Sequence, residues 1–256
     1  MKNLLPLIAM AAFVAGMPMA KAQLINVQVL DPDPNAGEPA MTGAAVLGSS
    51  GDTWNALSAS PSYNTSSDIP TTSLVSSTPL PTPVTFGLAV TSGATGYDSG
   101  VVYNNVPSNY SPLPLMGGYI YSYYGSEQVA TLEGLTPEDN FTLEVYTPLE
   151  GSSIALSGDA SDSGTTLDTS GASGDISSGV GVAYQTFTGV VGDSGDITLT
   201  LGAYGGDFGP AFSGLQIDET PAAVPEPSTY SLMALGVGML VLLARNRRQK
   251  FSGSSQ

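Results

Sequence analysis

Short runs of alternating hydrophobicity dominate the central part of this chain, about 200 residues long. In segment 141–147, Phe141, Leu143 and Val145 would share one face of a strand, while Thr142 and Glu144 share the other. A period of two is typical of a half-buried β-strand. Similar runs, bounded by Gly, Pro, Asn, Asp or Ser, occur at 24–30, 84–91, 119–124, 127–132, 153–157, 182–190, 196–201 and 214–217. With no convincing helix among them, these runs predict an all-β fold, an antiparallel β-sandwich such as a jelly roll.

Two stretches lack this alternation. Segment 58–83 holds prolines among many serines and threonines, which predicts a long Ser/Thr/Pro-rich surface loop or an extended spacer. Segment 157–181 is rich in Gly, Ser and Asp, and it predicts a long loop between two strands. A division into two domains near residue 83 would leave a small N-terminal part with few core residues. We therefore expect one β-sandwich domain at 23–223.

The charged residues are strongly segregated along the chain. All basic residues lie near the two ends, at Lys2, Lys21, Arg245, Arg247, Arg248 and Lys250. The 22 acidic residues lie between them, from Asp31 to Glu226, so that this part carries a formal charge of −22. It also lacks histidine and cysteine, which excludes Ser-His-Asp and Cys-His catalysis, Schiff-base lysines and arginine phosphate clamps. Without cations to neutralise phosphates, we expect no nucleic-acid binding.

The N-terminal segment has the features of a secretory signal peptide. Lys2 precedes an apolar run at 4–13, and small residues Ala20 and Ala22 flank Lys21 before Gln23. An A-x-A pattern after such a run is typical of a signal peptidase site. Segment 1–22 is therefore predicted to be removed, so that the mature protein starts at Gln23 outside the cytoplasm.

The C-terminal segment combines a Pro-Glu-Pro tripeptide, an apolar run and an arginine cluster. The run at 228–244 has 17 residues without a charge, close to the minimum for a helix that crosses about 30 Å of hydrocarbon. The basic residues after it would stay in the cytoplasm, which leaves the preceding domain outside. We therefore expect a single transmembrane helix at 228–244, although a short apolar run can also form a buried core helix.

This segment closely resembles the PEP-CTERM sorting signal of bacteria that produce exopolysaccharide. The resemblance rests on residues Val224, Pro225, Glu226, Pro227 and Ser228, followed after the apolar run by Arg245, Arg247 and Arg248. It covers segment 224–250, about a tenth of the chain. The resemblance implies that exosortase, a membrane peptidase, recognises the tail and processes a membrane-anchored precursor at the cell surface.

The body of the chain resembles, more weakly, the domains that precede this tail in many exported bacterial proteins. The resemblance rests on segments 51–55, 130–146 and 212–217. Those domains are similar to galactose-binding jelly rolls. The resemblance implies a sandwich of eight or nine strands that binds carbohydrate or matrix.

Aromatic residues are the first candidates for glycan contact. In segment 119–124, Tyr119, Tyr121 and Tyr123 would lie on one face of a strand and could stack on sugar rings, and Trp54 is the sole tryptophan. The alternative is packing, because tyrosines often pair across strands and a single tryptophan often fills a core.

Acidic turns are the candidates for a calcium site. Segment 31–35 places oxygen side chains at alternate positions, but Ala36 and Thr42 replace the glycine and glutamate of an EF-hand loop, so a solvated turn is the better interpretation. Turns rich in Gly and Ser contain Asp159, Asp162, Asp193 and Asp196, which could together bind Ca²⁺. The sequence does not show which of these carboxylates converge.

These features predict an exported, non-catalytic protein of the cell surface or extracellular matrix. Its expected partners are signal peptidase, exosortase, the membrane through its C-terminal helix, and extracellular polysaccharide. One alternative is a calcium-dependent carbohydrate-binding module. Another is a glycoside hydrolase, which would need two carboxylates about 5 to 9.5 Å apart in a cleft. No residue pattern isolates such a pair.

Overall fold

The computed structural model describes residues 22–30, 40–58, 68–91, 101–103, 113–122, 126–148, 152–161, 163–169, 176–203, 209–222 and 235–239. The chain divides into two units, Ala22–Thr220 and a second unit made of Met1–Lys21 and Pro221–Gln256. All the named strands lie in the first unit.

One layer of the fold is a five-stranded sheet. Its order is β11 (Tyr184–Val190), β8 (Asn140–Tyr146), β14 (Gly214–Thr220), β1 (Gln23–Leu30) and β2 (Asn55–Ser58). Neighbouring strands are antiparallel except β1 and β2, which pair in parallel. The first and last strands of the domain, β1 and β14, are therefore neighbours in the middle of this sheet.

The second layer is a six-stranded antiparallel sheet. Its order is β10 (Thr166–Asp168), β9 (Ser152–Gly158), β12 (Ile197–Ala203), β7 (Glu127–Glu133), β4 (Pro81–Thr91) and β3 (Ile69–Val75). A third, small sheet contains β13 (Ala211–Phe212), β6 (Tyr119–Tyr121) and β5 (Val101–Tyr103). The structure also has a short helix α2 (Leu113–Gly117) and a 3-10 turn η1 (Ile176–Ser178), which the sequence pattern did not predict.

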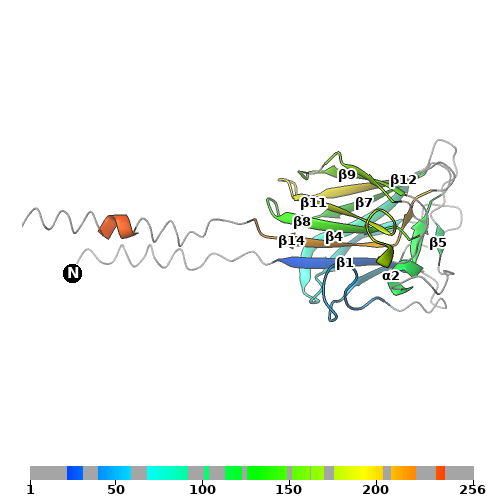
Figure 1. The fold of residues 1–256 in the computed structure, drawn as a ribbon, viewed down its shortest axis with the longest axis horizontal. Helices are drawn as coiled ribbons and strands as arrows, with labels where there is room; N and C mark the ends of the chain where they lie inside the picture. Colours follow the sequence, from blue (N-terminus) through cyan, green and yellow to red (C-terminus); the bar gives the residue numbers. More distant parts are fainter. Residues whose placement is uncertain are drawn as a thin grey trace, which may run out of the picture. The chain divides into compact units, whose positions relative to one another are not determined.

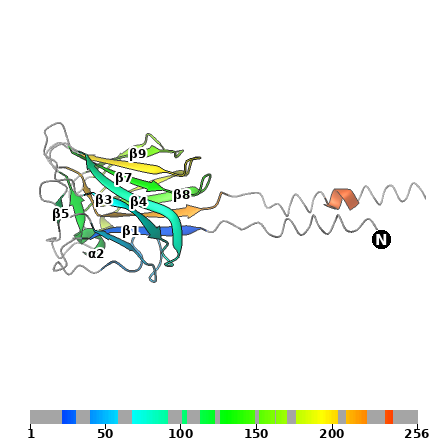
Figure 2. The same cartoon turned by 180° about the vertical axis from the view of Figure 1, so that it is seen from behind.

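The two large sheets face each other as the layers of a β-sandwich. Figure 1 shows β1, β8, β11 and β14 in front, and Figure 2 shows β3, β4, β7 and β9 on the opposite side. From β7 to β9 the chain passes from one sheet to the other and back, and β11, β12 and β14 continue this alternation. Such wrapping of successive strands around two sheets is the jelly-roll arrangement. The predicted all-β sandwich is confirmed.

The hydrophobic core fills the space between the two sheets. The five-stranded sheet contributes Ile25, Leu143 and Ile217, and the six-stranded sheet contributes Phe86 and Leu199, all at most 2% exposed. Each such side chain contributes roughly 1.5–3 kcal/mol when it leaves water. The alternation seen in the sequence therefore places one face of each strand in this core.

The predicted loop at 58–83 is wrong in part, because β3 and the start of β4 lie within it. Prolines normally argue against a strand, since they cannot donate to a ladder. Here Pro70 lies on β3, which is an edge strand and needs hydrogen bonds on one side alone. Pro81 and Pro83 precede Thr85, where the pairing of β4 with β7 begins. The prolines thus lie where a strand tolerates them.

Segment 157–181 also contains more structure than predicted. The edge strand β10 pairs with β9, and η1 lies further along. The resemblance implied eight or nine strands, whereas the two large sheets have five and six strands among the described residues.

The two targeting segments lie mostly outside the described residues. Of the expected transmembrane helix at 228–244, the structure describes residues 235–239, which are helical and exposed. Within the described part of the chain, no helix is both long and apolar enough to cross a membrane. Of the predicted signal peptide 1–22, residues 1–21, which include Ala20, lie outside the described residues, whereas Ala22 is exposed and Gln23 begins β1.

Candidate functional site

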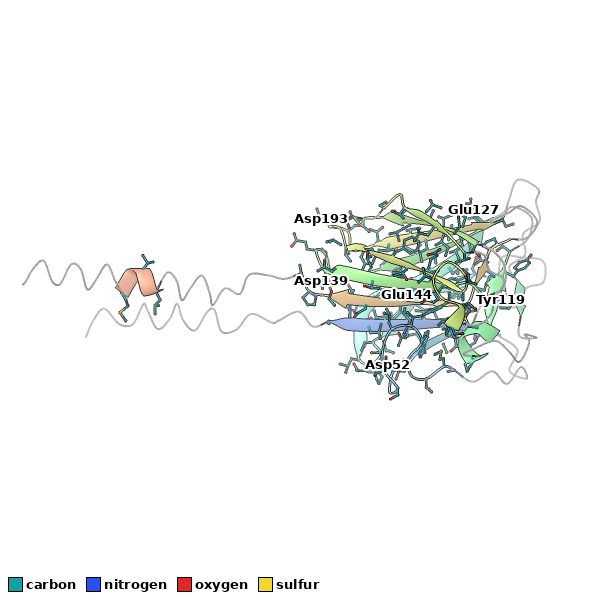
Figure 3. The ribbon with its side chains drawn as sticks, in the orientation of Figure 1. Asp52, Tyr119, Glu127, Asp139, Glu144 and Asp193 are labelled. Carbon is teal, nitrogen blue, oxygen red and sulfur yellow. The ribbon has the colours of Figure 1, made fainter. Side chains whose placement is uncertain are left out.

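The tyrosines proposed for glycan contact are buried. Tyr119 is 4% exposed and Tyr121 is 7% exposed, because β6 lies between β13 and β5. Figure 3 shows Tyr119, the first residue of β6 in the small sheet, at one end of the sandwich. Tyr123 lies outside the described residues. As placed, the two described rings offer no open face to a sugar, which agrees with the packing alternative.

Trp54 is also buried, at 5% exposed. Its indole Nε1 donates a hydrogen bond of 2.8 Å to the carbonyl oxygen of Gly43. It belongs to a second hydrophobic cluster, on the outer face of the five-stranded sheet, together with Met41, Leu115, Met116, Tyr146 and Ala183. Trp54 therefore fixes the loop at 40–54 against the sheet instead of presenting a binding platform.

The acidic turns bring two of the candidate calcium ligands to one serine. The backbone N–H of Ser194 donates to Oδ2 of Asp159 at 2.6 Å, and its hydroxyl donates to Oδ1 of Asp196. Asp193 lies in the same turn, near one end of the sandwich (Figure 3). Asp162 is outside the described residues. In the described part of the chain, no group of three or more acidic side chains is arranged to hold a metal ion.

A row of polar side chains crosses the outer face of the five-stranded sheet. It runs through Thr186 on β11, Glu144 on β8, Gln216 on β14 and Asn26 on β1, each directly opposite the next. Directly opposed residues in an antiparallel sheet have their side chains in contact range. The sequence predicted that Glu144 faces away from the core, but the register that creates this row depends on distant strands.

Gln216 fastens the loop at 40–54 over this row. Its Nε2 donates to Oδ1 of Asn26 at 2.7 Å and to the carbonyl oxygen of Leu47 at 3.1 Å. Its Oε1 accepts from the backbone N–H of Leu47 at 2.9 Å and from the hydroxyl of Tyr146 at 2.5 Å. Because these buried groups satisfy one another, the loop can cover β14 and β1 at little cost.

Glu144 is a buried carboxylate in the middle of the sheet (Figure 3), with 3% of its surface exposed. The Thr186 hydroxyl donates a hydrogen bond of 2.8 Å to its Oε2. Burial raises the pKa of Glu144 above its ordinary value, and the bond from Thr186 offsets part of this effect. Tyr184, close by, has its pKa raised by burial and then by the charge of Glu144.

Beside the covered part of the sheet, a strip of polar side chains stays accessible. This β11–β8 strip consists of the half-buried or exposed Tyr184, Thr186 and Thr188 on β11, Thr142 on β8 and the adjoining Asp218 on β14. The buried Glu144 lies among them on the same face of the sheet. Thr188 lies opposite Thr142, which in turn lies opposite Asp218, so the hydroxyls and the carboxylate are neighbours. Burial raises the pKa of Asp218. Hydroxyl donors, carboxylate acceptors and one phenol ring are the groups that match sugar hydroxyls and C–H faces.

The C-terminal tail matches a known motif. Residues 223–248 match the PEP-CTERM protein-sorting motif. The predicted sorting signal is therefore confirmed, and this motif implies export. The motif residues 224–228 and the arginines at 245, 247 and 248 lie outside the described residues. No curated protein sequence matches this chain.

Solved structures of carbohydrate-binding modules are similar to the body. A family 35 carbohydrate binding module from an environmental isolate is 20% identical, with a TM-score of 0.31 over 50% of this chain and 90% of that chain. A CBM35 module from Cellvibrio japonicus is 16% identical, with a TM-score of 0.28 over 51% and 91%. An Arthrobacter globiformis isomalto-dextranase complexed with panose is 11% identical, with a TM-score of 0.28 over 61% and 24%. At these TM-scores the likenesses decide nothing about ligand or activity.

Proposed function

We propose that this protein is a non-catalytic component of the cell surface or extracellular matrix that associates with exopolysaccharide. In this proposal exosortase processes its membrane-anchored precursor at the tail. The observation that carries the proposal is the sorting motif at 223–248, which follows a separate β-sandwich domain. The charge of this domain and its β11–β8 strip limit the class of polymer that it can bind.

The charge of the domain limits its partners. Residues 23–222 contain no Lys, Arg or His, so the domain repels anionic polymers and lacks a clamp for phosphate. Neutral polysaccharides bind instead through hydroxyls, carboxylates and aromatic rings. Such groups meet in the β11–β8 strip, which supports this strip as the contact surface in place of Tyr119, Tyr121 and Trp54.

Within the strip, Glu144 acts as a positioning residue for Thr186. Because the Thr186 hydroxyl donates its hydrogen to Glu144, its oxygen lone pairs point elsewhere and can accept a hydrogen bond from a sugar hydroxyl. Tyr184 lies in the next position along β11 on the same face. The Tyr184 ring and the Thr186 oxygen would bind a single sugar weakly. A polysaccharide with many sugar units would bind more strongly, because several such contacts form at once.

A hydrolase is the second candidate, because Glu144 and Asp218 lie diagonally across β8 and β14. Diagonal neighbours are about 7–8 Å apart, within the range that glycosidases use. Burial, however, moves the pKa of both carboxylates in the same direction, upward. An acid and base pair needs pKa values that are moved apart. Binding without turnover is thus the better-supported function.

The test is a pull-down of residues 23–222 with exopolysaccharide from a bacterium that carries exosortase, with and without calcium. We expect binding by the wild-type domain and at least tenfold weaker binding by Tyr184→Ala and Thr186→Val. Thr200→Val is the matched control, because Thr200 is a half-buried threonine on the outer face of the other sheet. Equal binding by all variants would remove the strip as the site. Polysaccharide turnover that Glu144→Gln abolishes would establish a hydrolase.

A further inference from the structure

Glu219 is a buried carboxylate at the end of the sandwich where the domain begins and ends. It lies on β14 directly opposite Gln23, the first residue of β1, and is 1% exposed. Its Oε1 accepts a hydrogen bond of 2.8 Å from the backbone N–H of Thr136, and its Oε2 accepts one from the side-chain amide of Gln23. Two neutral donors therefore hold a group that is ordinarily charged.

The charged groups around Glu219 are acidic. Burial is the main cause that raises the pKa of Glu219, and the bonds from Thr136 and Gln23 lower it. The neighbouring carboxylates are Asp139, in the turn after β7, and Asp218, on β14, and both raise the pKa further. Residues 23–222 provide no basic side chain that could balance this cluster. A buried carboxylate without a cation normally costs stability when it ionises.

Signal peptidase would supply the missing cation. Hydrolysis of the peptide bond between Ala22 and Gln23 adds the elements of water, so that Ala22 leaves as a carboxylate and the Gln23 nitrogen becomes an α-amine. That amine has an ordinary pKa of about 7.7–8.0 and is protonated below it. Directly opposed strand residues have Cα atoms about 4.5–5.5 Å apart. The new ammonium group therefore arises on the residue that lies directly opposite Glu219 and whose side chain already donates a hydrogen bond to its carboxylate.

We propose that the end of the sandwich is a binding site for the α-ammonium of Gln23, with Glu219 as its counter-ion. Cleavage removes Lys21 together with the signal peptide and creates an ammonium group in the domain itself, where it neutralises a carboxylate for which residues 23–222 offer no basic side chain. This inference rests on the proposed export and on cleavage before Gln23. It adds a consequence of that cleavage, because processing and folding stability become linked.

The test compares residues 23–222 with a free α-amine and with an acetylated one. Both forms come from a fusion cut directly before Gln23, and mass spectrometry verifies that Gln23 has not cyclised. Near pH 6.5 we expect the free form to have a melting temperature about 2–4 °C above that of the acetylated form. In a domain of this size, such a shift corresponds to a rise of less than one unit in the pKa of the α-amine on folding. A partner raises the folded-state pKa of an amine, so this difference is present below pH 8 and disappears as pH rises through the raised value.

Glu219→Gln should abolish the difference between the free and acetylated forms. Asp193→Asn is the control, since it also removes one acidic charge from an end turn but should keep the difference. Equal melting of the two wild-type forms, or a difference that persists in Glu219→Gln, would overturn the proposal. Acetylation should leave polysaccharide binding at the β11–β8 strip unchanged, so a failure of the glycan proposal is recognised separately. N-terminal sequencing of exported protein that starts elsewhere than Gln23 would overturn the premise of cleavage.

Discussion

The Thr186 hydroxyl donates a hydrogen bond of 2.8 Å to Oε2 of Glu144, its direct cross-strand neighbour on β8. The pair joins an accessible residue to one that is almost fully buried. The hydrogen bond therefore couples the orientation of the accessible Thr186 hydroxyl to the ionisation of the buried Glu144 carboxylate.

Glu144→Gln should stabilise the domain at neutral pH. Burial raises the folded-state pKa of Glu144, so the wild-type protein loses stability as pH rises from the ordinary pKa of a glutamate to the raised one. The amide cannot ionise and still accepts the hydrogen bond from Thr186. We expect a melting temperature about 2–4 °C above wild type at pH 7–8, which corresponds to about 1 kcal/mol.

The gain from Glu144→Gln should disappear below about pH 4, near the ordinary pKa of a glutamate, where both proteins are uncharged at this position. Glu127→Gln is the control, because Glu127 is exposed on β7. Thermal melts across this pH range measure the effect. A gain that is equally large at pH 4 and pH 7 would show that packing, and not ionisation, causes it.

Trp54→Ala should destabilise the domain by about 3–5 kcal/mol, because it leaves a large cavity under the loop at 40–54. Trp54→Phe should cost less, since it keeps much of the volume and loses the hydrogen bond to Gly43. Urea unfolding measures both.

Saturating polysaccharide should leave the fluorescence of this single tryptophan unchanged. A shift in its emission would instead place Trp54 at the binding surface.

Millimolar calcium should raise the melting temperature of residues 23–222 more than sodium at equal ionic strength. Sodium screens all the charges of the acidic domain. Calcium screens them too, and it is also coordinated wherever oxygen atoms converge at about 2.3–2.6 Å from the ion. Asp159→Asn should remove the excess effect of calcium if the turn around Ser194 contributes. Equal effects of the two salts would leave a diffuse acidic surface without a calcium site.

Replacement of Arg245, Arg247 and Arg248 by glutamine should change membrane retention or processing of the precursor. Basic residues after an apolar helix hold its orientation, and these three lie within the matched motif. Lys250→Gln is the matched control, because Lys250 follows the motif. Cell fractionation and gel mobility in a host with exosortase measure the outcome. Unchanged localisation and mobility of the triple variant would contradict the proposed role of the tail.

Local alternation was enough to predict most of the strands of the sandwich, but not those at sheet edges. Phe141, Leu143 and Val145 were placed on one face of a strand by sequence alone, and all three are in the core. The strands that were missed, such as β3, sit at edges where prolines and polar residues are tolerated. In β3, the buried hydrophobic residues Ile69 and Leu74 are too far apart to give a periodic signal.

The candidate site was less predictable, because its residues meet through long-range pairing. Glu144 and Thr186 are 42 positions apart, and no local pattern indicates that they are opposed. Tyr119 and Tyr121 alternate as an exposed row would. Their burial depends on β13 and β5, which pack on both sides of β6. A sequence pattern shows which residues share a face, but not what covers that face.

The pairing of β1 with β14 has a consequence for the time at which the protein can fold. The hydrogen bond between Gln23 and Glu219 spans 196 positions, and β14 lies between β1 and β8 in the sheet. A chain that emerges from the translocon with its N-terminus first cannot complete this sheet until almost the whole domain has crossed. Loops of such length close slowly. In the proposed export, the native sandwich should therefore form only after almost the whole domain has crossed the membrane.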